Sequence, residues 1–138
     1  MNADTLELIP IGFVRSDLTS REDAPKQGFE GGVEAVVEIE QAFERALDGV
    51  SQGQELILLT WFHQSDRETL MVHPRGDISN PLAGVFVTRS PARPNPIGLH
   101  RGRVIRIDGR KLTVHPLEAI DGTPLLDIKP LLEESADF

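Results

Sequence analysis

The sequence predicts a mostly β fold: a compact β-barrel with one short helix and long loops. Six or seven short segments rich in apolar or β-branched residues follow one another along the 138-residue chain, separated by polar stretches. A strong two-residue hairpin signal, Asp108-Gly109, joins two of these segments. Only residues 41–47 carry apolar side chains at helical spacing, and Gly49 follows them as a stop signal.

The first half of the chain contains three predicted strands and the helix. Residues 6–14 alternate loosely between apolar and polar side chains and predict a first strand. Residues 33–39 alternate more clearly, which is typical of a half-buried strand. Residues 55–62 form a nearly continuous apolar run of strand length, so we expect them to form a central strand.

The second half adds further short strands. Residues 69–72 predict a short strand inside a polar stretch, and residues 85–88 predict a buried one because three of the four are β-branched. Residues 99–107 predict a strand whose alternation is degraded by arginines. Residues 111–115 follow the hairpin turn, and residues 125–128 predict the last strand.

The length of the chain suits one domain over residues 1–138 with a core of its own. No internal repeat, linker or low-complexity segment divides it. Two long polar loops, residues 16–32 and 63–80, interrupt the strands. Loops of this length in a small domain are more often functional than idle.

Composition excludes several classes of protein. There is no cysteine, which excludes disulfides, thiolate metal sites and cysteine nucleophiles. The four histidines lack the spacing of a zinc motif, so we expect no metal. No apolar run approaches the roughly 20 residues of a membrane span, and the N-terminus does not resemble a signal peptide. We therefore expect a cytoplasmic protein without membrane contact.

The charge is unevenly distributed. The net charge of −8 argues against broad, non-specific binding of nucleic acid. From residue 89 to residue 111, however, the chain contains seven Arg or Lys and only one acid, Asp108. A basic patch on an acidic protein can bind RNA, whereas the alternative is that these arginines are merely solvated.

Residues 84–99 form the most unusual segment of the chain. Pro91, Pro94 and Pro96 lie within six residues. Each proline fixes its own φ and pushes the preceding residue away from helical geometry, so the loop is stiff and extended. A stiff loop loses little entropy when it binds a ligand. Its polar side chains are Arg89, Ser90, Arg93 and Asn95.

The segment 84–99 resembles the signature of the TsaA-like family of S-adenosylmethionine-dependent tRNA methyltransferases. Three further stretches match the family in the same order: residues 11–16, 61–64, and 121–124 together with 127–130. The resemblance covers nearly the whole chain. It implies a compact β-barrel that binds S-adenosylmethionine without a Rossmann sheet, and a homodimer whose cofactor site lies close to a two-fold interface. The spacing of residues alone, without G-x-G-x-x-G or a P-loop, suggests no nucleotide-type cofactor.

The resemblance also implies a set of site residues. The positions that match the family's cofactor contacts are Pro25, Lys26, Gln27, His63, Gln64, Arg89, Leu99, Asp121, Gly122, Thr123 and Pro124. The family more often has Arg at the position of Lys26, and lysine keeps the charge but loses the bidentate fork.

The methyl transfer to a nitrogen that the resemblance implies suggests candidate catalytic residues, and the basic side chains suggest candidate RNA contacts. The nitrogen must lose its proton, so Asp121 or His63 is the candidate base, and Arg89 or Arg93 would stabilise the developing anion. The candidate RNA contacts are Arg93, Asn95, Arg101 and Arg103. Strand alternation predicts Arg101 and Arg103 on one face and Arg106 on the other.

By resemblance, the predicted activity is S-adenosylmethionine-dependent methylation of N6 of threonylcarbamoyl-adenosine beside the anticodon of tRNA. Long family members carry a further C-terminal domain after the motif at 127–130, and this chain is expected to lack it. The alternatives are a non-catalytic module that binds S-adenosylmethionine or RNA, and a methyltransferase that acts on a small molecule.

Overall fold

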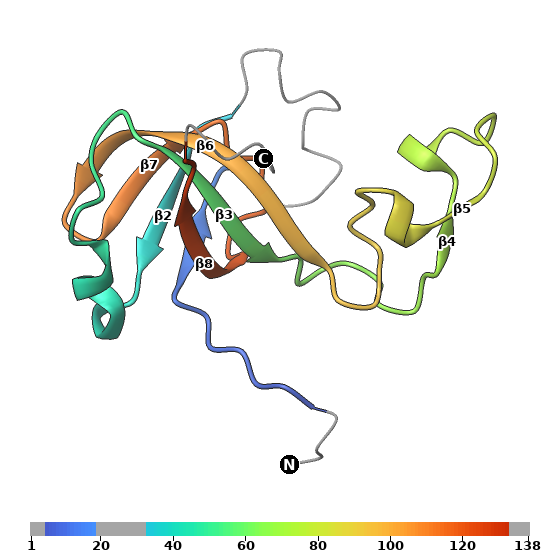
Figure 1. The fold of residues 1–138 in the computed structure, drawn as a ribbon, viewed down its shortest axis with the longest axis horizontal. Coiled ribbons are helices and arrows are strands. Elements are labelled where there is room, and N and C mark those ends of the chain that lie inside the picture. The colour runs from blue at the N-terminus through green and yellow to red at the C-terminus, as the bar shows by residue number, and fades with distance from the viewer. Residues whose placement is uncertain (1–4, 19–32, 133–138) are drawn as a thin grey trace.

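The computed structural model describes residues 5–18 and 33–132, and in it six antiparallel strands close into a barrel (Figure 1). Their order around the barrel is β1-β2-β7-β6-β3-β8, and β8 pairs back onto β1. The fold class predicted from the sequence is confirmed. The strands are β1 (Gly12–Arg15), β2 (Ala35–Ile39), β3 (Glu55–Trp61), β6 (Ile97–Asp108), β7 (Lys111–His115) and β8 (Pro124–Pro130).

Alternation along the strands fills the barrel with aliphatic side chains, because successive residues of a strand point to opposite faces. The predicted central strand, β3, pairs with β6 on one side and β8 on the other. The fully buried members of the core are Val14, Val37, Leu58, Leu112, Val114 and Leu125, each with 0% exposure. Burying such side chains stabilises the fold by about 1.5–3 kcal/mol each.

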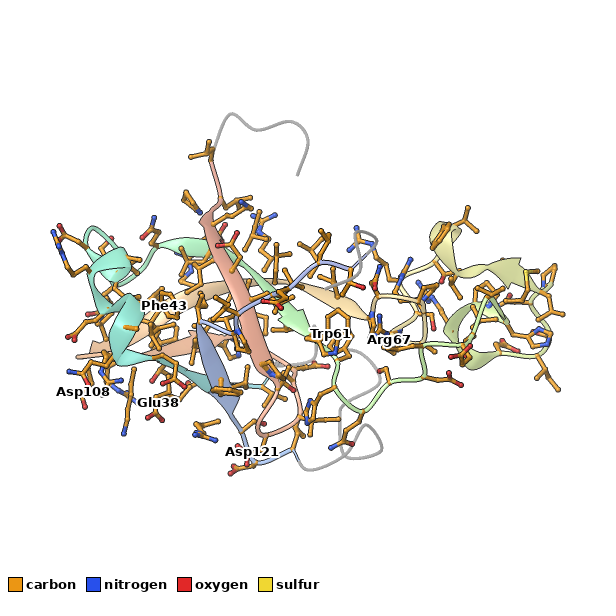
Figure 2. The ribbon with its side chains drawn as sticks, turned by 90° about the horizontal axis from the view of Figure 1, so that it is seen from below. Glu38, Phe43, Trp61, Arg67, Asp108 and Asp121 are labelled. Atoms are coloured by element: carbon orange, nitrogen blue, oxygen red, sulfur yellow. The ribbon has the colours of Figure 1, made fainter. Side chains whose placement is uncertain are left out.

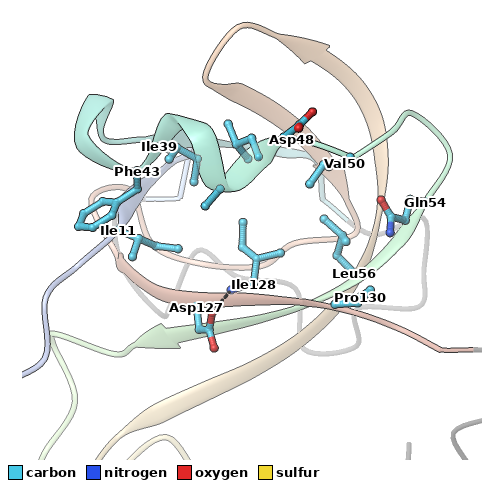
Figure 3. A pocket seen from close by; sticks show the side chains of 13 residues that line it. Ile11, Ile39, Phe43, Asp48, Val50, Gln54, Leu56, Asp127, Ile128 and Pro130 are labelled. Carbon is cyan, nitrogen blue, oxygen red and sulfur yellow. Dashed lines mark hydrogen bonds between the residues drawn. The ribbon is translucent and has the colours of Figure 1, made fainter.

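The predicted helix is present as the 3-10 helix η2 (Gln41–Leu47), which lies at one end of the barrel (Figures 1 and 3). None of its residues is fully buried, but Phe43 and Leu47 pack against the core. Beneath it is a mainly apolar pocket of about 400 Å³, which also contains Asp127 and Ile128 of β8. Asp127 Oδ1 accepts a hydrogen bond of 2.9 Å from the backbone N–H of Ile128.

Residues 62–96 leave the barrel as a separate extension, here called the arm (Figure 1). Its strands β4 (Met71–Val72) and β5 (Ala83–Gly84) pair only with each other. Two 3-10 turns, η3 (Pro74–Gly76) and η4 (Val85–Val87), complete it. The arm begins after β3 and returns to the barrel at β6, so it displays its loops beyond one barrel end.

The prediction of a buried strand over residues 85–88 is wrong. Val85 is buried, but the next two residues form a 3-10 turn and expose 81% of Phe86 and 81% of Val87. The turn is closed by the N–H of Thr88, which donates to the carbonyl of Val85 at 3.1 Å. An apolar, β-branched run becomes a strand only where a neighbouring strand can pair with it, and β4 offers only two residues.

Two further boundaries differ from the prediction. The first strand begins at Gly12 rather than residue 6, because residues 6–9 are exposed and pair with no strand. In β6, a bulge between Val104 and Arg106 shifts the alternation by one residue. Arg106 pairs with Thr113, whose two neighbours face the core, and therefore points outward. The prediction that Arg106 lies on the opposite face from Arg101 and Arg103 is wrong for this reason.

Candidate functional site

Three of the sequence motifs meet at the barrel end from which the arm departs. Trp61 ends β3 and Pro124 begins β8. Asn95 lies near the end of residues 88–96, here called the proline-rich loop. All three line one groove of about 730 Å³. The remaining lining residues come from the N-terminal segment, the arm and the adjoining strands: Thr5, Leu6, Leu8, Pro10, Arg67, Ile97 and Leu126.

Arg67 holds this groove together. Its guanidinium lies 5.0 Å from the centre of the Trp61 ring, a cation–π contact (Figure 2). It also donates from Nε to the carbonyl of Pro94 at 2.7 Å and from Nη2 to Oδ1 of Asn95 at 3.1 Å. One side chain therefore ties the end of β3 to the proline-rich loop. Sequence reasoning missed Arg67 because it stands in a polar loop without periodicity or a motif.

The turn at residues 121–124 is fixed to the end of β1. The N–H of Asp121 donates to the carbonyl of Leu18 at 2.6 Å, and that of Gly122 donates to Val14 at 2.8 Å. Gly122 has φ +85°, a left-handed conformation that favours glycine. Oδ1 of Asp121 accepts from the N–H of Ser16 at 3.0 Å. The Asp121 carboxylate is thus held in one place, exposed, with Oδ2 free of bonds from the described residues.

Three further predicted cofactor contacts, His63, Gln64 and Leu99, are accessible. His63 and Gln64 are exposed in the turn that follows β3. Leu99 is 43% exposed on the outer face of β6, two residues after Ile97, which lines the groove. Thr123 is buried, and its hydroxyl donates to the carbonyl of Ile120 at 2.6 Å, so its side chain supports the turn. Pro25, Lys26 and Gln27 lie outside the described residues.

Arg89 and Arg93 lie on the arm and differ in their surroundings. Arg89 is exposed and lines a cleft of about 840 Å³ between the two loops of the arm. Arg93 is half-buried and donates to three backbone carbonyls, those of Val85, Thr88 and Ser90, at 2.9–3.1 Å. Arg93 therefore holds the proline-rich loop in shape. Among the described residues, Arg89 lines this cleft and does not line the groove that contains Asn95 and Pro124.

The structure places Arg101 and Arg103 side by side on the outer face of β6. Both pair with the carboxylate of Glu55 on β3, each with an N–O distance of 2.9 Å. The hydrogen bond and charge of Arg101 lower the pKa of Glu55, and the charge of Arg103 adds to this. The Glu55 carboxylate thus offsets part of the positive charge of Arg101 and Arg103, two of the predicted RNA contacts.

His100 lies in the interior, behind the groove. It pairs across the sheet with Leu58, a core residue, and its Nε2 is 2.8 Å from Oγ1 of Thr60. The ring of Phe62 meets it edge-to-face at 5.8 Å. Burial lowers the pKa of His100 to about 4, so the imidazole is neutral near pH 7. The ring is half-buried and supports the barrel end.

Within residues 5–18 and 33–132, no three His, Asp or Glu side chains gather in an arrangement that could hold a metal ion. In the same part of the chain, no helix has the length and apolar character needed to cross a membrane.

The described residues thus form a closed antiparallel β-barrel of non-Rossmann type, with polar motifs at one end and the proline-containing arm beyond it. Residues 13–137 match the family model of the tRNA-methyltransferase O N-terminal domain. The chain belongs to this family, as the resemblance predicted.

Curated relatives and solved structures agree with this assignment. A probable S-adenosyl-L-methionine-binding protein of Methanocaldococcus jannaschii is 46% identical over 103 residues, 72% of this chain and 82% of the relative. A protein described in the same words from Methanothermobacter thermautotrophicus is 40% identical over 129 residues, 94% of this chain and 92% of the relative. The crystal structure of TrmO from Pseudomonas aeruginosa superposes with a TM-score of 0.75 at 28% identity, over 99% of this chain. This chain spans 62% of that structure's length.

Proposed function

We propose that this protein binds S-adenosyl-L-methionine and transfers its methyl group to a tRNA base, N6 of threonylcarbamoyl-adenosine beside the anticodon. The observation that carries the proposal is the family match over residues 13–137, whose motifs converge on one barrel end. The names of the curated relatives support the cofactor, and the likeness to TrmO supports the tRNA substrate. Such a substrate would place the protein in the cytoplasm.

The residues of this barrel end suit a sulfonium cofactor with a planar base and a carboxylate. The groove offers an aromatic ring and aliphatic walls, and Asp121, in the turn before β8, offers a fixed carboxylate. Arg89, on the arm and outside the groove, offers a guanidinium without a partner among the described residues. When bound, S-adenosylmethionine supplies an electrophilic methyl group. The protein's part is then mainly to align the attacking nitrogen with that group, which is catalysis by positioning.

Proton removal is the second task. The N6 nitrogen of the substrate is conjugated to a carbonyl, and it becomes a good nucleophile only when its proton leaves. Asp121 or His63 would accept that proton, while S-adenosylmethionine, when bound, would supply the methyl group and a neutral thioether as its leaving group. Asp121 is the better placed of the two because the N–H of Ser16 fixes its orientation. A cationic side chain of the arm, Arg89, would stabilise the negative charge that develops on the conjugated carbonyl.

We also propose a homodimer. Large apolar side chains are exposed on and next to the arm strands and on the start of β6: Leu70, Met71, Leu82, Ile97 and Leu99. Exposed apolar surface of this kind marks protein–protein contacts. A two-fold contact uses the same surface on both copies, and it would let the arm of one copy approach the barrel end of the other. Arg89 and Asp121, which lie in different parts of one chain, could then face one site.

A second candidate function is a binding module without turnover. It is favoured by the names of the curated relatives, which state S-adenosyl-L-methionine binding and no transfer reaction.

The experiment that separates the two candidates compares wild type with Asp121→Asn. Asparagine can still accept the hydrogen bond from Ser16 but cannot take a proton. We expect methylation of tRNA by wild type and a loss of about 10²–10⁴-fold in rate for the variant, with calorimetric affinity for S-adenosylhomocysteine changed far less. His63→Gln serves as the matched variant for the alternative base. Cofactor binding without any methylation by wild type would favour the binding module.

A further inference from the structure

The apolar pocket beneath η2, here called the η2 pocket, lies at the end of the barrel away from the arm (Figures 1 and 3). Among the described residues, it shares no lining residue with the groove that contains Trp61 and Pro124. It is lined instead by Asp127, Ile128 and Pro130, from the stretch 127–130 that the sequence singled out and that does not line the groove. The η2 pocket therefore belongs to a part of the molecule that the proposed function does not use.

The walls of the η2 pocket are mainly hydrocarbon. Its floor includes Ile39 and Leu56, which expose 2% and 1% of their surface. Partly buried apolar residues complete the walls: Ile11, Phe43, Leu47, Val50 and Ile128. Protein interiors leave few voids larger than a water molecule, whereas this opening of about 400 Å³ has the size of a small-molecule pocket.

Hydrogen bonds hold the walls in place without a ligand. Just before η2, the N–H of Glu40 donates to the carbonyl of Ile11 on the barrel at 2.9 Å. Just after η2, the N–H of Gly53 donates to the carbonyl of Val104 at 2.7 Å. Both ends of the η2 segment are thus fixed to the barrel, so a ligand would not have to order it.

The charges around the η2 pocket favour an uncharged ligand. No Arg, Lys or His is among its described lining residues, so an anion would find no partner. Both oxygens of Asp127 are occupied, Oδ1 by the N–H of Ile128 at 2.9 Å and Oδ2 by Nζ of Lys129 at 3.2 Å. Figure 3 shows this carboxylate on the side of β8 away from η2. Asp48 is exposed to water, where pairing with a cation contributes little.

One amide at the mouth of the pocket is available to a ligand. Gln54 is half-buried and lies beside Leu56 (Figure 3). Its Oε1 accepts from the N–H of Ser51 at 3.2 Å, and its Nε2 has no partner among the described residues. An amide N–H next to an apolar wall suits one acceptor oxygen. We infer that the η2 pocket binds an uncharged, mainly apolar molecule about the size of two fused aromatic rings, with one acceptor oxygen bonded by Gln54.

The probe for this site is acetyl-dimethylamino-naphthalene, an uncharged aromatic ketone whose fluorescence shifts to the blue in apolar surroundings. Two analogues test the chemistry of recognition. Dimethylamino-naphthalene lacks the acceptor oxygen, and dimethylamino-naphthalene sulfonate carries a negative charge. Because the η2 pocket and the groove are lined by different residues, competition with S-adenosylhomocysteine shows whether the probe occupies the cofactor site instead.

The variants change the pocket from two sides. Ala46→Phe places a ring on η2 at a lining position, where it can fill the opening. Ala42→Phe is the matched control, because it makes the same change at an exposed position of η2 that does not line the pocket. Gln54→Met removes the amide but keeps the length of the side chain. Urea unfolding first shows that each variant is folded.

We expect wild type to bind the ketone with a Kd of about 0.1 mM. Ala46→Phe should bind it about ten-fold more weakly and Ala42→Phe as wild type does. Gln54→Met should weaken binding of the ketone about five-fold, the loss of one hydrogen bond, and should leave binding of dimethylamino-naphthalene unchanged. The sulfonate should bind wild type more weakly than the ketone, and saturating S-adenosylhomocysteine should not displace the ketone.

Four results would overturn the inference. They are no blue-shifted binding of the ketone by wild type, equal affinities of Ala46→Phe and Ala42→Phe, displacement of the ketone by S-adenosylhomocysteine, and binding of the sulfonate at least as tight as that of the ketone. The first two would mean that the pocket is not a ligand site. Displacement would place the probe in the cofactor site, and tight binding of the sulfonate would contradict the preference for an uncharged ligand.

Discussion

At the scale of single residues, the neutral His100 makes stability depend on pH. Its pKa falls from 6.5 to about 4 on burial, so between these values the unfolded chain binds a proton that the folded chain does not. Lowering the pH through this window therefore destabilises the fold, by at most about 3 kcal/mol once the pH falls below the folded pKa.

The measurement is urea unfolding between pH 7 and pH 4.5. This range stops above the region where the carboxylates Glu55 and Asp77, whose pKa values are lowered by their partners, take up protons. We expect the free energy of unfolding of wild type to fall across the range, and that of His100→Gln to fall much less. Equal pH profiles for the two proteins would mean that His100 is not responsible.

Gly98 allows the close packing around His100. A Cβ at this position would overlap the ring of Phe62 and the hydroxyl of Thr60. We expect Gly98→Ala to lower the free energy of unfolding by about 1–3 kcal/mol through overpacking. Gly84→Ala is the matched control, because a Cβ at Gly84 meets nothing within 4 Å and should change stability by less than about 0.5 kcal/mol. Equal destabilisation of both variants in urea unfolding would refute this account of Gly98.

At the scale of elements, the proline-rich loop depends on Arg67 for its attachment to β3. Arg67→Lys keeps the charge but cannot bond both Pro94 and Asn95 in the planar fork seen here. If the loop must be held rigid for binding, the variant should bind S-adenosylhomocysteine about ten-fold more weakly, with little change in thermal midpoint. Arg106→Lys is the control, because Arg106 is an exposed arginine at the end of β6 away from the groove, and this variant should bind as wild type does. Calorimetry that finds the same affinity in both variants would contradict the role given to Arg67.

The elements that sequence predicted well are strands that pack into the barrel core. The strands β2, β3 and β7 begin and end close to their predicted bounds because one face of each packs into the barrel core. The apolar run at 85–88 failed because nothing in the sequence says whether a partner strand lies beside it. The bulge in β6 could not be predicted from the sequence either, because it depends on how β6 and β7 pair.

The candidate site was predictable where motifs are contiguous and unpredictable where it depends on tertiary contacts. The groove brings together Trp61, Asn95 and Pro124, each of which belongs to a stretch singled out from the sequence. Arg67 stands in a polar loop that shows no pattern, and its importance follows only from its cation–π contact with Trp61 and its hydrogen bonds to Pro94 and Asn95. The pairing of Arg101 and Arg103 with Glu55 likewise required the register of β3 on β6.

At the scale of the whole molecule, the proposed homodimer would bring the arm of one copy to the barrel end of the other. We expect light scattering at micromolar concentration to give a mass close to twice the 15.2 kDa of one chain. Leu82→Glu places a charge on the exposed apolar surface of the arm and should shift the mass toward that of a monomer. Ile107→Glu, at the far end of β6, should leave the dimer intact. A mass near 15.2 kDa for wild type would rule out the proposed dimer.

The central claim is methyl transfer from S-adenosylmethionine to tRNA, and the most direct measurement of it follows a labelled methyl group. The purified protein is incubated with methyl-labelled S-adenosylmethionine and with tRNA that either carries or lacks threonylcarbamoyl-adenosine, and the nucleosides are then identified by mass spectrometry. We predict a methyl group on N6 of threonylcarbamoyl-adenosine in the first tRNA and none in the second, with the transfer strongly reduced in Asp121→Asn. A protein that binds S-adenosylhomocysteine with one site per chain yet transfers no label to either tRNA would contradict the account.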